Sequence, residues 1–222
     1  MSRKEIHRHD LSTNEIVTRY ATLDIETSSV DPEEGQTVAI GIGTVDVLDG
    51  EMSVDVLSYG SAQGSEKALI RRAFTRINEF EPSALVTFNG EWFDLDFLGG
   101  RIERLEFDQK PTLECAEHHL DLFLPRKQKA DTAGVKWPKL ETVLSSHDLS
   151  VPVTEWRGQE LTNTRFGEEL APAYLESVQQ GNEARVDDLE SVIYEYTATD
   201  VEANIALYEA DAGRQYEPML LG

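Results

Sequence analysis

The sequence predicts an α/β fold in which helices flank a mixed sheet of five strands. Residues 18–60 hold three extended segments rich in β-branched residues, and helical apolar patterns then alternate with short apolar segments. The chain has 222 residues, of which 40% are hydrophobic, enough for one sizeable core. We therefore expect a single domain over residues 18–212, with an N-terminal tail or edge segment at 1–17 and a C-terminal tail at 213–222.

The predicted sheet begins with residues 18–28, 37–50 and 51–60. Asp49–Gly50, between the second and third segments, is a strong signal for a two-residue hairpin turn. The "GIG" of Gly41 to Gly43 lacks the third glycine and the following helix of a dinucleotide site, so we expect strand glycines there. Together these features predict an antiparallel meander.

The rest of the chain alternates between predicted helices and strands. Apolar residues recur at helical spacing over 65–80, and the short, nearly all-apolar segment 82–90 is typical of a central strand. A helix is expected over 91–105, interrupted or bent at Gly99–Gly100, and a fifth strand over 116–125, ended by Pro125. The remaining prediction comprises helices at 138–147, 170–179 and 186–212 and an irregular stretch at 151–167.

The strongest bulk property is a net charge of -22 at pH 7, with acidic residues spread along the whole chain. A folded protein this acidic is expected in a high-salt cytoplasm, where screening shortens repulsion to a few ångströms. We therefore expect a halophilic origin. The charge also opposes simple electrostatic binding of nucleic acid, which depends on cationic side chains.

Cys115 is the only cysteine, so no internal disulfide is possible, which fits a reducing cytoplasm. We expect it to be a small buried hydrophobe. No apolar run is long enough for a membrane span, and residues 1–13 lack the apolar stretch of a secretory signal. These features predict a cytoplasmic protein with no membrane partner.

Asp24 and Glu26 stand two residues apart inside a predicted strand, so both carboxylates project from the same face of the sheet. Adjacent like charges repel and contribute nothing to folding. Leu23 and Ile25 bury only the opposite face. A metal or catalytic role explains the pair, and a solvated edge strand is the alternative.

Two further segments of the chain supply candidate carboxylates. Asp94 and Asp96 follow the strand that ends at Asn89, where α/β folds build their sites, although charge-capping of a helix start is also possible. The two differ by about 200° around a helix, so only one can face a site. Tyr196 and Asp200, four residues apart, share a helical face, and a structural hydrogen bond between them is the alternative.

These placements bring together four carboxylates and a phenol without histidine or cysteine. Such a set favours hard cations, namely Mg²⁺ or Mn²⁺. Two such ions about 4 Å apart can hold both the attacking and the leaving oxygen of a phosphodiester. The residues therefore indicate a two-metal nuclease site.

The motifs "LDIET", "NGEWFDLDFL" and "YTATD" resemble those of the DEDD, or DnaQ-like, 3′–5′ exonucleases of the ribonuclease H-like superfamily. A tyrosine four residues before the last aspartate is similar to the DEDDy branch. The phrases "LVTFNGEWFDLDFLGGRI", "HHLDL" and "KLETVLSSHDL" resemble YprB-like ribonuclease H-like domains most closely. The resemblance spans about residues 18–210 and implies a ribonuclease H-like fold.

The resemblance implies that Asp24 bridges both metals, Glu26 and Asp200 bind the nucleophile-side metal and Asp94 serves the second metal. Tyr196 would orient the attacking water. The implied substrate-binding residues are Thr27, Asn89 and Phe93. Two departures stand out: Ser28–Ser29 replaces the usual Thr-Gly, and Asp96 occupies a position often taken by proline, which leaves open which aspartate is the ligand.

A basic segment at residues 125–139, expected to be a loop, could contact phosphates, and its Trp137 could stack on a base. The polar residues of "HHLDL", among them His119 and Asp121, are expected to border the site.

We therefore expect a metal-dependent 3′–5′ exonuclease acting on DNA or RNA with a 3′ end or single strand. The alternatives are a catalytically inactive nucleic-acid-binding module and a structure-specific endonuclease. The sequence does not decide between DNA and RNA, nor the oligomeric state.

Overall fold

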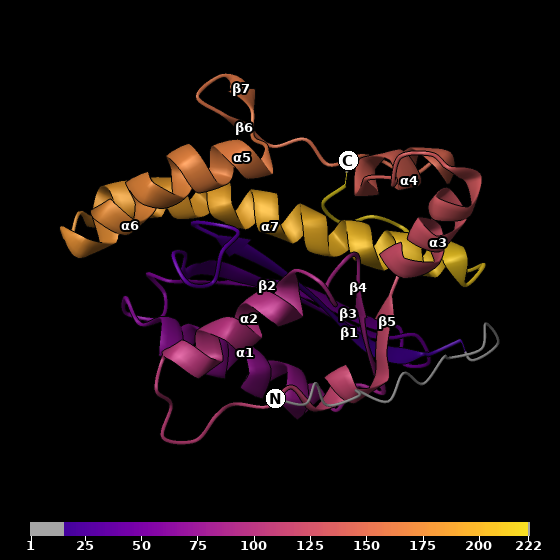
Figure 1. Ribbon diagram of the computed structural model, residues 1–222, viewed down its shortest axis with the longest axis horizontal. Helices are drawn as coiled ribbons and strands as arrows, with labels where there is room; N and C mark the ends of the chain where they lie inside the picture. Colours follow the sequence, from indigo (N-terminus) through magenta and orange to yellow (C-terminus); the bar gives the residue numbers. More distant parts are fainter. Residues whose placement is uncertain (1–15, 222) are drawn as a thin grey trace.

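The computed structural model describes residues 16–221, so the predicted N-terminal tail lies outside the described residues except for Ile16 and Val17. Five strands form one sheet in the order β3-β2-β1-β4-β5 (Figure 1). Strands β1, β2 and β3 run antiparallel, and β4 and β5 are parallel to β1. The predicted mixed sheet is confirmed. Its strands are β1 (Arg19–Thr27), β2 (Thr37–Asp46), β3 (Glu51–Ser58), β4 (Ala84–Thr87) and β5 (His119–Asp121).

Helices cover both faces of the sheet. The long helix α7 crosses one face, where it contacts β1, β2 and β3, and α1 and α2 lie on the other (Figure 1). The longer helices are α1 (Glu66–Phe80), α2 (Asp94–Arg104), α3 (Phe123–Ala133), α4 (Leu140–Ser146), α6 (Ala171–Gln179) and α7 (Glu183–Asp211). The short elements are a 3-10 turn (Glu114–His118), a hairpin formed by β6 (Glu155–Trp156) and β7 (Gln159–Glu160), the helix α5 (Asn163–Arg165) and a π-helical turn (Phe166–Leu170).

The alternation of side chains along β1 separates two cores. Ala21, Leu23 and Ile25 pack with α1 and α2 on one face. Tyr20 lies on the opposite face and packs with the C-terminal half of α7. Because Asp24 is an even number of residues from Tyr20, its side chain also projects toward α7.

The predicted fifth strand and the predicted basic loop are both partly wrong. Only His119–Asp121 forms a strand, and α3 begins at Phe123 and continues to Ala133. Pro125 is the third residue of α3, in the first turn, where a missing N–H leaves no helical hydrogen bond unmade. This proline therefore starts a helix instead of ending a strand.

Helix α2 is also more regular than expected. It runs without interruption through Gly99 and Gly100. Gly100 faces the loop after β1, since a Cβ built there would lie 2.9 Å from Pro32. The glycine therefore provides room for a neighbouring loop, and the predicted break at Gly99–Gly100 is wrong.

Gly41 and Gly43 let α7 lie directly on β2. A Cβ built at Gly41 would lie 2.4 Å from Cγ2 of Val201 and 2.8 Å from Cγ2 of Thr197, distances that ordinary packing excludes. Gly43 is equally crowded. Because Gly41 pairs with Asp24 in the β1–β2 ladder, the close approach occurs beside Asp24. The prediction of strand glycines is confirmed.

Within residues 16–221, no helix combines the length and the apolar character needed to cross a membrane.

The contact between α7 and β2 predicts a large effect of Gly41→Ala. The added methyl group must displace α7, so we expect a loss of about 1–3 kcal/mol in the free energy of unfolding, measured by urea denaturation. Gly99→Ala is the matched control, because a Cβ built there meets no atom within 4 Å. This control should stabilise by about 0.4–1 kcal/mol. Wild-type stability of Gly41→Ala would contradict the packing of α7 on β2.

Candidate metal centre

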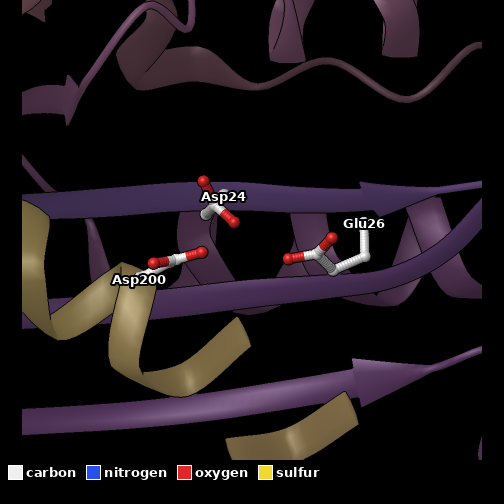
Figure 2. Close-up of side chains that lie close together, drawn as sticks. All are labelled: Asp24, Glu26 and Asp200. Atoms are coloured by element: carbon white, nitrogen blue, oxygen red, sulfur yellow. The ribbon is translucent and has the colours of Figure 1, made fainter. Parts of the chain in front are cut away.

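Three carboxylates converge where α7 crosses β1. Asp24, Glu26 and Asp200 each offer an oxygen, and these oxygens all lie within 4.8 Å of one another. Figure 2 shows the three side chains, two from the strand and one from the helix. Glu26 is buried, and the other two are half-buried. The structure thus unites residues that are far apart in the sequence.

The local structure of β1 explains how two of these carboxylates share a face. The strand pairs regularly with β2 up to Glu26, and the register then shifts between Glu26 and Thr27. On its other edge, β1 pairs with β4 only as far as Thr22. Asp24 and Glu26 therefore lie beyond the paired part of that edge, where α2 begins.

Asp94, the first residue of α2, lies beside this trio. Its side chain is buried, and its Oδ1 accepts a hydrogen bond from the backbone N–H of Ile25 at 3.0 Å. This bond satisfies an N–H group that β4 does not pair. Asp96 is exposed on the same helix. Of the two aspartates that the sequence left open, the structure places Asp94 at the site.

Burial raises the pKa of all four carboxyl groups, and neighbouring carboxylates raise it further. Burial is the larger cause for Asp24 and Glu26, and neighbouring carboxylates raise both pKa values further. Burial raises the pKa of Asp94 to about 7, although the Ile25 N–H lowers it in part. The pKa of Asp200 is also raised to about 7 by burial and by Glu141 of α4.

This donor set fits a divalent cation. Among residues 16–221, none of the four carboxylates takes part in an ion pair with lysine, arginine or histidine. Clustered carboxylates with raised pKa values must either hold protons or share a cation. Oxygen-only donors favour Mg²⁺ or Mn²⁺ over softer metals.

Tyr196 lies one helical turn before Asp200, but its hydroxyl group does not bond to that aspartate. It donates to Oδ1 of Asn163 at 2.6 Å, and its ring stacks on Phe166 with centroids 5.6 Å apart. Burial, followed by the charge of Glu26, raises the pKa of the phenol, so Tyr196 stays neutral and can act only as a hydrogen-bond partner. The alternative of a structural Tyr196–Asp200 hydrogen bond is not observed.

Asp121 organises the loop that carries Asn89. Its Oδ1 accepts from the N–H groups of Asn89 at 2.8 Å and Phe123 at 2.9 Å, and its Oδ2 accepts from that of Glu91 at 3.1 Å. Asn89 has a φ of 68°, an unusual conformation that these bonds help to hold. The expectation that polar residues of "HHLDL" border the site agrees with this contact.

The other two predicted substrate-binding residues lie at the same edge of the sheet. Thr27 is buried at the bulge that ends β1. Phe93 is partly buried at the start of α2, next to Asp94, with its ring 6.2 Å from that of Phe97.

Two contributors to the site could not be predicted from the sequence. Asn163 lies in a stretch expected to be irregular, and nothing in its local sequence marks it as the partner of Tyr196. Glu141 follows a basic segment and looks like a surface charge, yet it acts on Asp200.

The raised pKa values predict how stability depends on pH. The pKa of Asp200 in the folded protein, about 7, lies above its ordinary value of 3.8, so the folded state binds more protons between about pH 4 and pH 7. Stability of the metal-free protein should therefore fall as pH rises through this window. Asp200→Asn should make that fall shallower, leaving the part that comes from the other three carboxyl groups, and should be about 1–3 kcal/mol more stable than wild type at pH 7. Thermal melts in EDTA across this range measure the difference.

Millimolar Mn²⁺ should remove the same fall in the wild-type protein, because a bound cation replaces the protons. Asp96→Asn, at an exposed position, should keep the wild-type pH profile. Identical profiles for wild type and Asp200→Asn would contradict the assigned electrostatics.

The family to which the sequence is similar agrees with this architecture. The family model described as the RNase_H superfamily matches residues 21–210. Among solved structures, the family B DNA polymerase from the hyperthermophilic archaeon Pyrobaculum calidifontis has a TM-score of 0.51 and 17% identity, covering 88% of this chain and 27% of the polymerase chain. E. coli Exonuclease I, in complex with a 5cy-dT13 oligonucleotide, has a TM-score of 0.39 and 14% identity. The match covers 79% of this chain and 43% of the Exonuclease I chain.

No curated protein matches the chain significantly. The chain spans less than half the length of either structural neighbour, and at these identities the polymerase supports the fold alone. The family model, by contrast, covers well over half of the chain and includes Asp24 and Glu26 of β1 and Asp200 of α7. The chain belongs to the RNase H superfamily.

Proposed function

We propose that this protein is a metal-dependent 3′–5′ exonuclease of the DEDDy type that hydrolyses phosphodiester bonds of DNA or RNA. One observation carries the proposal: Asp24, Glu26 and Asp200 converge on an RNase H-like sheet with Asp94 beside them. Membership in the RNase H superfamily supports a nuclease that acts on nucleic acid. The exonucleolytic mode, the 3′–5′ direction and the kinship with YprB-like domains rest on the motif resemblance.

The four carboxylates have distinct proposed roles. Asp24 would help to hold both cations, and Glu26 and Asp200 would hold the cation on the nucleophile side. Asp94, whose Oδ1 accepts the Ile25 N–H, would serve the second cation. When bound, two divalent cations would stabilise the charge on the attacking and leaving oxygens of the phosphodiester.

Tyr196 is proposed to orient the attacking water by a hydrogen bond. Its phenol is neutral and lies one turn from Asp200, so it can donate to or accept from a water but cannot act as a base near pH 7. The hydroxyl can accept a hydrogen bond from the water while it donates to Asn163, or it can turn to donate to the water instead. Asn163 therefore holds the phenol in place before the substrate arrives.

The proposed contacts to the substrate strand lie at the carboxyl end of β4 and the end of β1. Asn89, in the loop fixed by Asp121, and Phe93, before Asp94, are the proposed contacts to the terminal nucleotides. Thr27 follows Glu26 at the bulge. This edge is where α/β folds commonly bind ligands.

Degradation assays test the proposed function. With Mg²⁺ or Mn²⁺, at low salt and in molar KCl, we expect release of mononucleotides from the 3′ end of linear single strands and no cleavage of a closed circle. Asp24→Asn should reduce the rate by more than about 10³-fold, and Tyr196→Phe by about 10²-fold. Asp96→Asn, exposed on the same helix as Asp94, should keep wild-type activity.

The outcomes separate the alternatives. Cutting of the circle would replace the proposal with an endonuclease, and inertness toward every strand would favour a catalytically inactive binding module. Wild-type activity in Asp24→Asn would contradict the carboxylate mechanism. Matched DNA and RNA strands in the same assay identify the preferred substrate.

A further inference from the structure

Two exposed tryptophans lie against each other beside the candidate metal centre. Trp92 and Trp137 are 47% and 48% exposed, and their ring centroids are 6.5 Å apart at an angle of 60°. They come from separate loops, one between β4 and α2 and the other between α3 and α4. The third tryptophan of the chain, Trp156, is buried.

A lysine and a phenylalanine fix the two rings. The Nζ of Lys127 lies 5.0 Å from the Trp92 centroid and 4.4 Å from that of Trp137, so one cation contacts both aromatic rings. Buried Phe123 packs edge-on against Trp137 at 6.1 Å. We call Trp92, Trp137 and Lys127 the aromatic patch. Its rings are held in place although they are half exposed, which suits a surface that receives a flat ligand.

Charge around the aromatic patch differs from that of the whole chain. Asp131 borders the aromatic patch, but its carboxylate accepts hydrogen bonds from Lys127 at 2.8 Å and from Nε1 of Trp137 at 2.6 Å. Three further lysines of the basic segment 125–139 are exposed, and none of them forms an ion pair within residues 16–221. They are Lys129, Lys136 and Lys139. On a chain of net charge -22, this is a local cationic surface.

The aromatic patch is physically continuous with the candidate metal centre. Trp92 precedes Asp94 by two residues, so their Cα atoms are at most about 7 Å apart. Asp121 joins the segments that carry the two rings, because it accepts from the N–H of Glu91, next to Trp92, and from that of Phe123, which packs edge-on against Trp137. A strand whose end reaches the carboxylates would therefore pass close to both indole rings.

We propose that the aromatic patch binds unpaired bases of a single-stranded nucleic acid by stacking on Trp92 and Trp137. The proposal rests on the proposed nuclease function and adds the side chains that would hold the substrate strand, since stacking requires bases that are free of a duplex. It also addresses how a highly acidic chain holds a polyanion. Phosphate contacts weaken steeply with salt, whereas stacking on aromatic rings does not depend on counterion release.

The test measures binding without hydrolysis. Tryptophan fluorescence and anisotropy in EDTA report on three probes: an oligothymidylate of about 12 nucleotides, an abasic strand of equal length and charge, and a duplex. We expect the oligothymidylate to quench fluorescence and to bind more tightly than the other two probes. Trp92→Leu and Trp137→Leu should each weaken its binding at least about fivefold and leave abasic binding unchanged.

Two sets of variants serve as controls. Trp92→Phe and Trp137→Phe keep an aromatic ring and should retain most of the affinity, which separates stacking from disturbance of the loops. Tyr194→Leu removes an exposed ring on α7 and should bind like wild type. In a salt series, the leucine variants should shift log Kd without changing its slope, because no phosphate contact is lost.

Wild-type affinity in both leucine variants, or equal weakening for the abasic strand, would overturn the proposal. These outcomes are distinguishable from failure of the proposed function. If no strand is hydrolysed with any metal but base-dependent binding still requires the tryptophans, the stacking inference stands and the nuclease proposal fails. If hydrolysis occurs and the leucine variants bind like wild type, only the stacking inference fails.

Discussion

The candidate site is defined by electrostatic repulsion among buried carboxylates. Asp24, Glu26 and Asp200 place oxygens within 4.8 Å of one another where burial raises their pKa values, and no cationic side chain of the described residues pairs with them. Such an arrangement opposes folding unless protons or cations occupy it. The surrounding fold imposes it: Gly41 and Gly43 let α7 rest on β2, and the bulge after Glu26 ends the strand at the site. A divalent cation fits this geometry.

Around this centre, side chains that are not themselves ligands set its shape. Asp121 uses both oxygens to fix the loop that precedes Asp94, and Asn163 holds the phenol of Tyr196 one turn from Asp200. Both contacts join segments that are distant in the sequence. The site is thus assembled before any substrate binds, which lowers the cost of reorganisation during reaction.

Much of this arrangement could be predicted from the sequence, because it follows from local periodicity. A period of two places Asp24 and Glu26 on one face, and a spacing of four places Tyr196 over Asp200. Other features depend on tertiary contacts that periodicity does not contain. The choice of Asp94 over Asp96 required knowing which side of α2 is buried, and Pro125 suits a helix start as well as a strand end. The pairing of Trp92 with Trp137 depends on how two loops meet.

The central claim is that the carboxylates form a binding site for divalent cations, and calorimetric titration of Mn²⁺ tests it most directly. Titrations in two buffers of different ionisation enthalpy also count the protons released. The account predicts that wild type binds two ions at pH 7 with release of protons from the carboxyl groups of raised pKa. It predicts that Asp24→Asn loses most of this heat and Asp96→Asn keeps it. Absence of Mn²⁺ binding to the folded wild-type protein, or unchanged binding in Asp24→Asn, would contradict it.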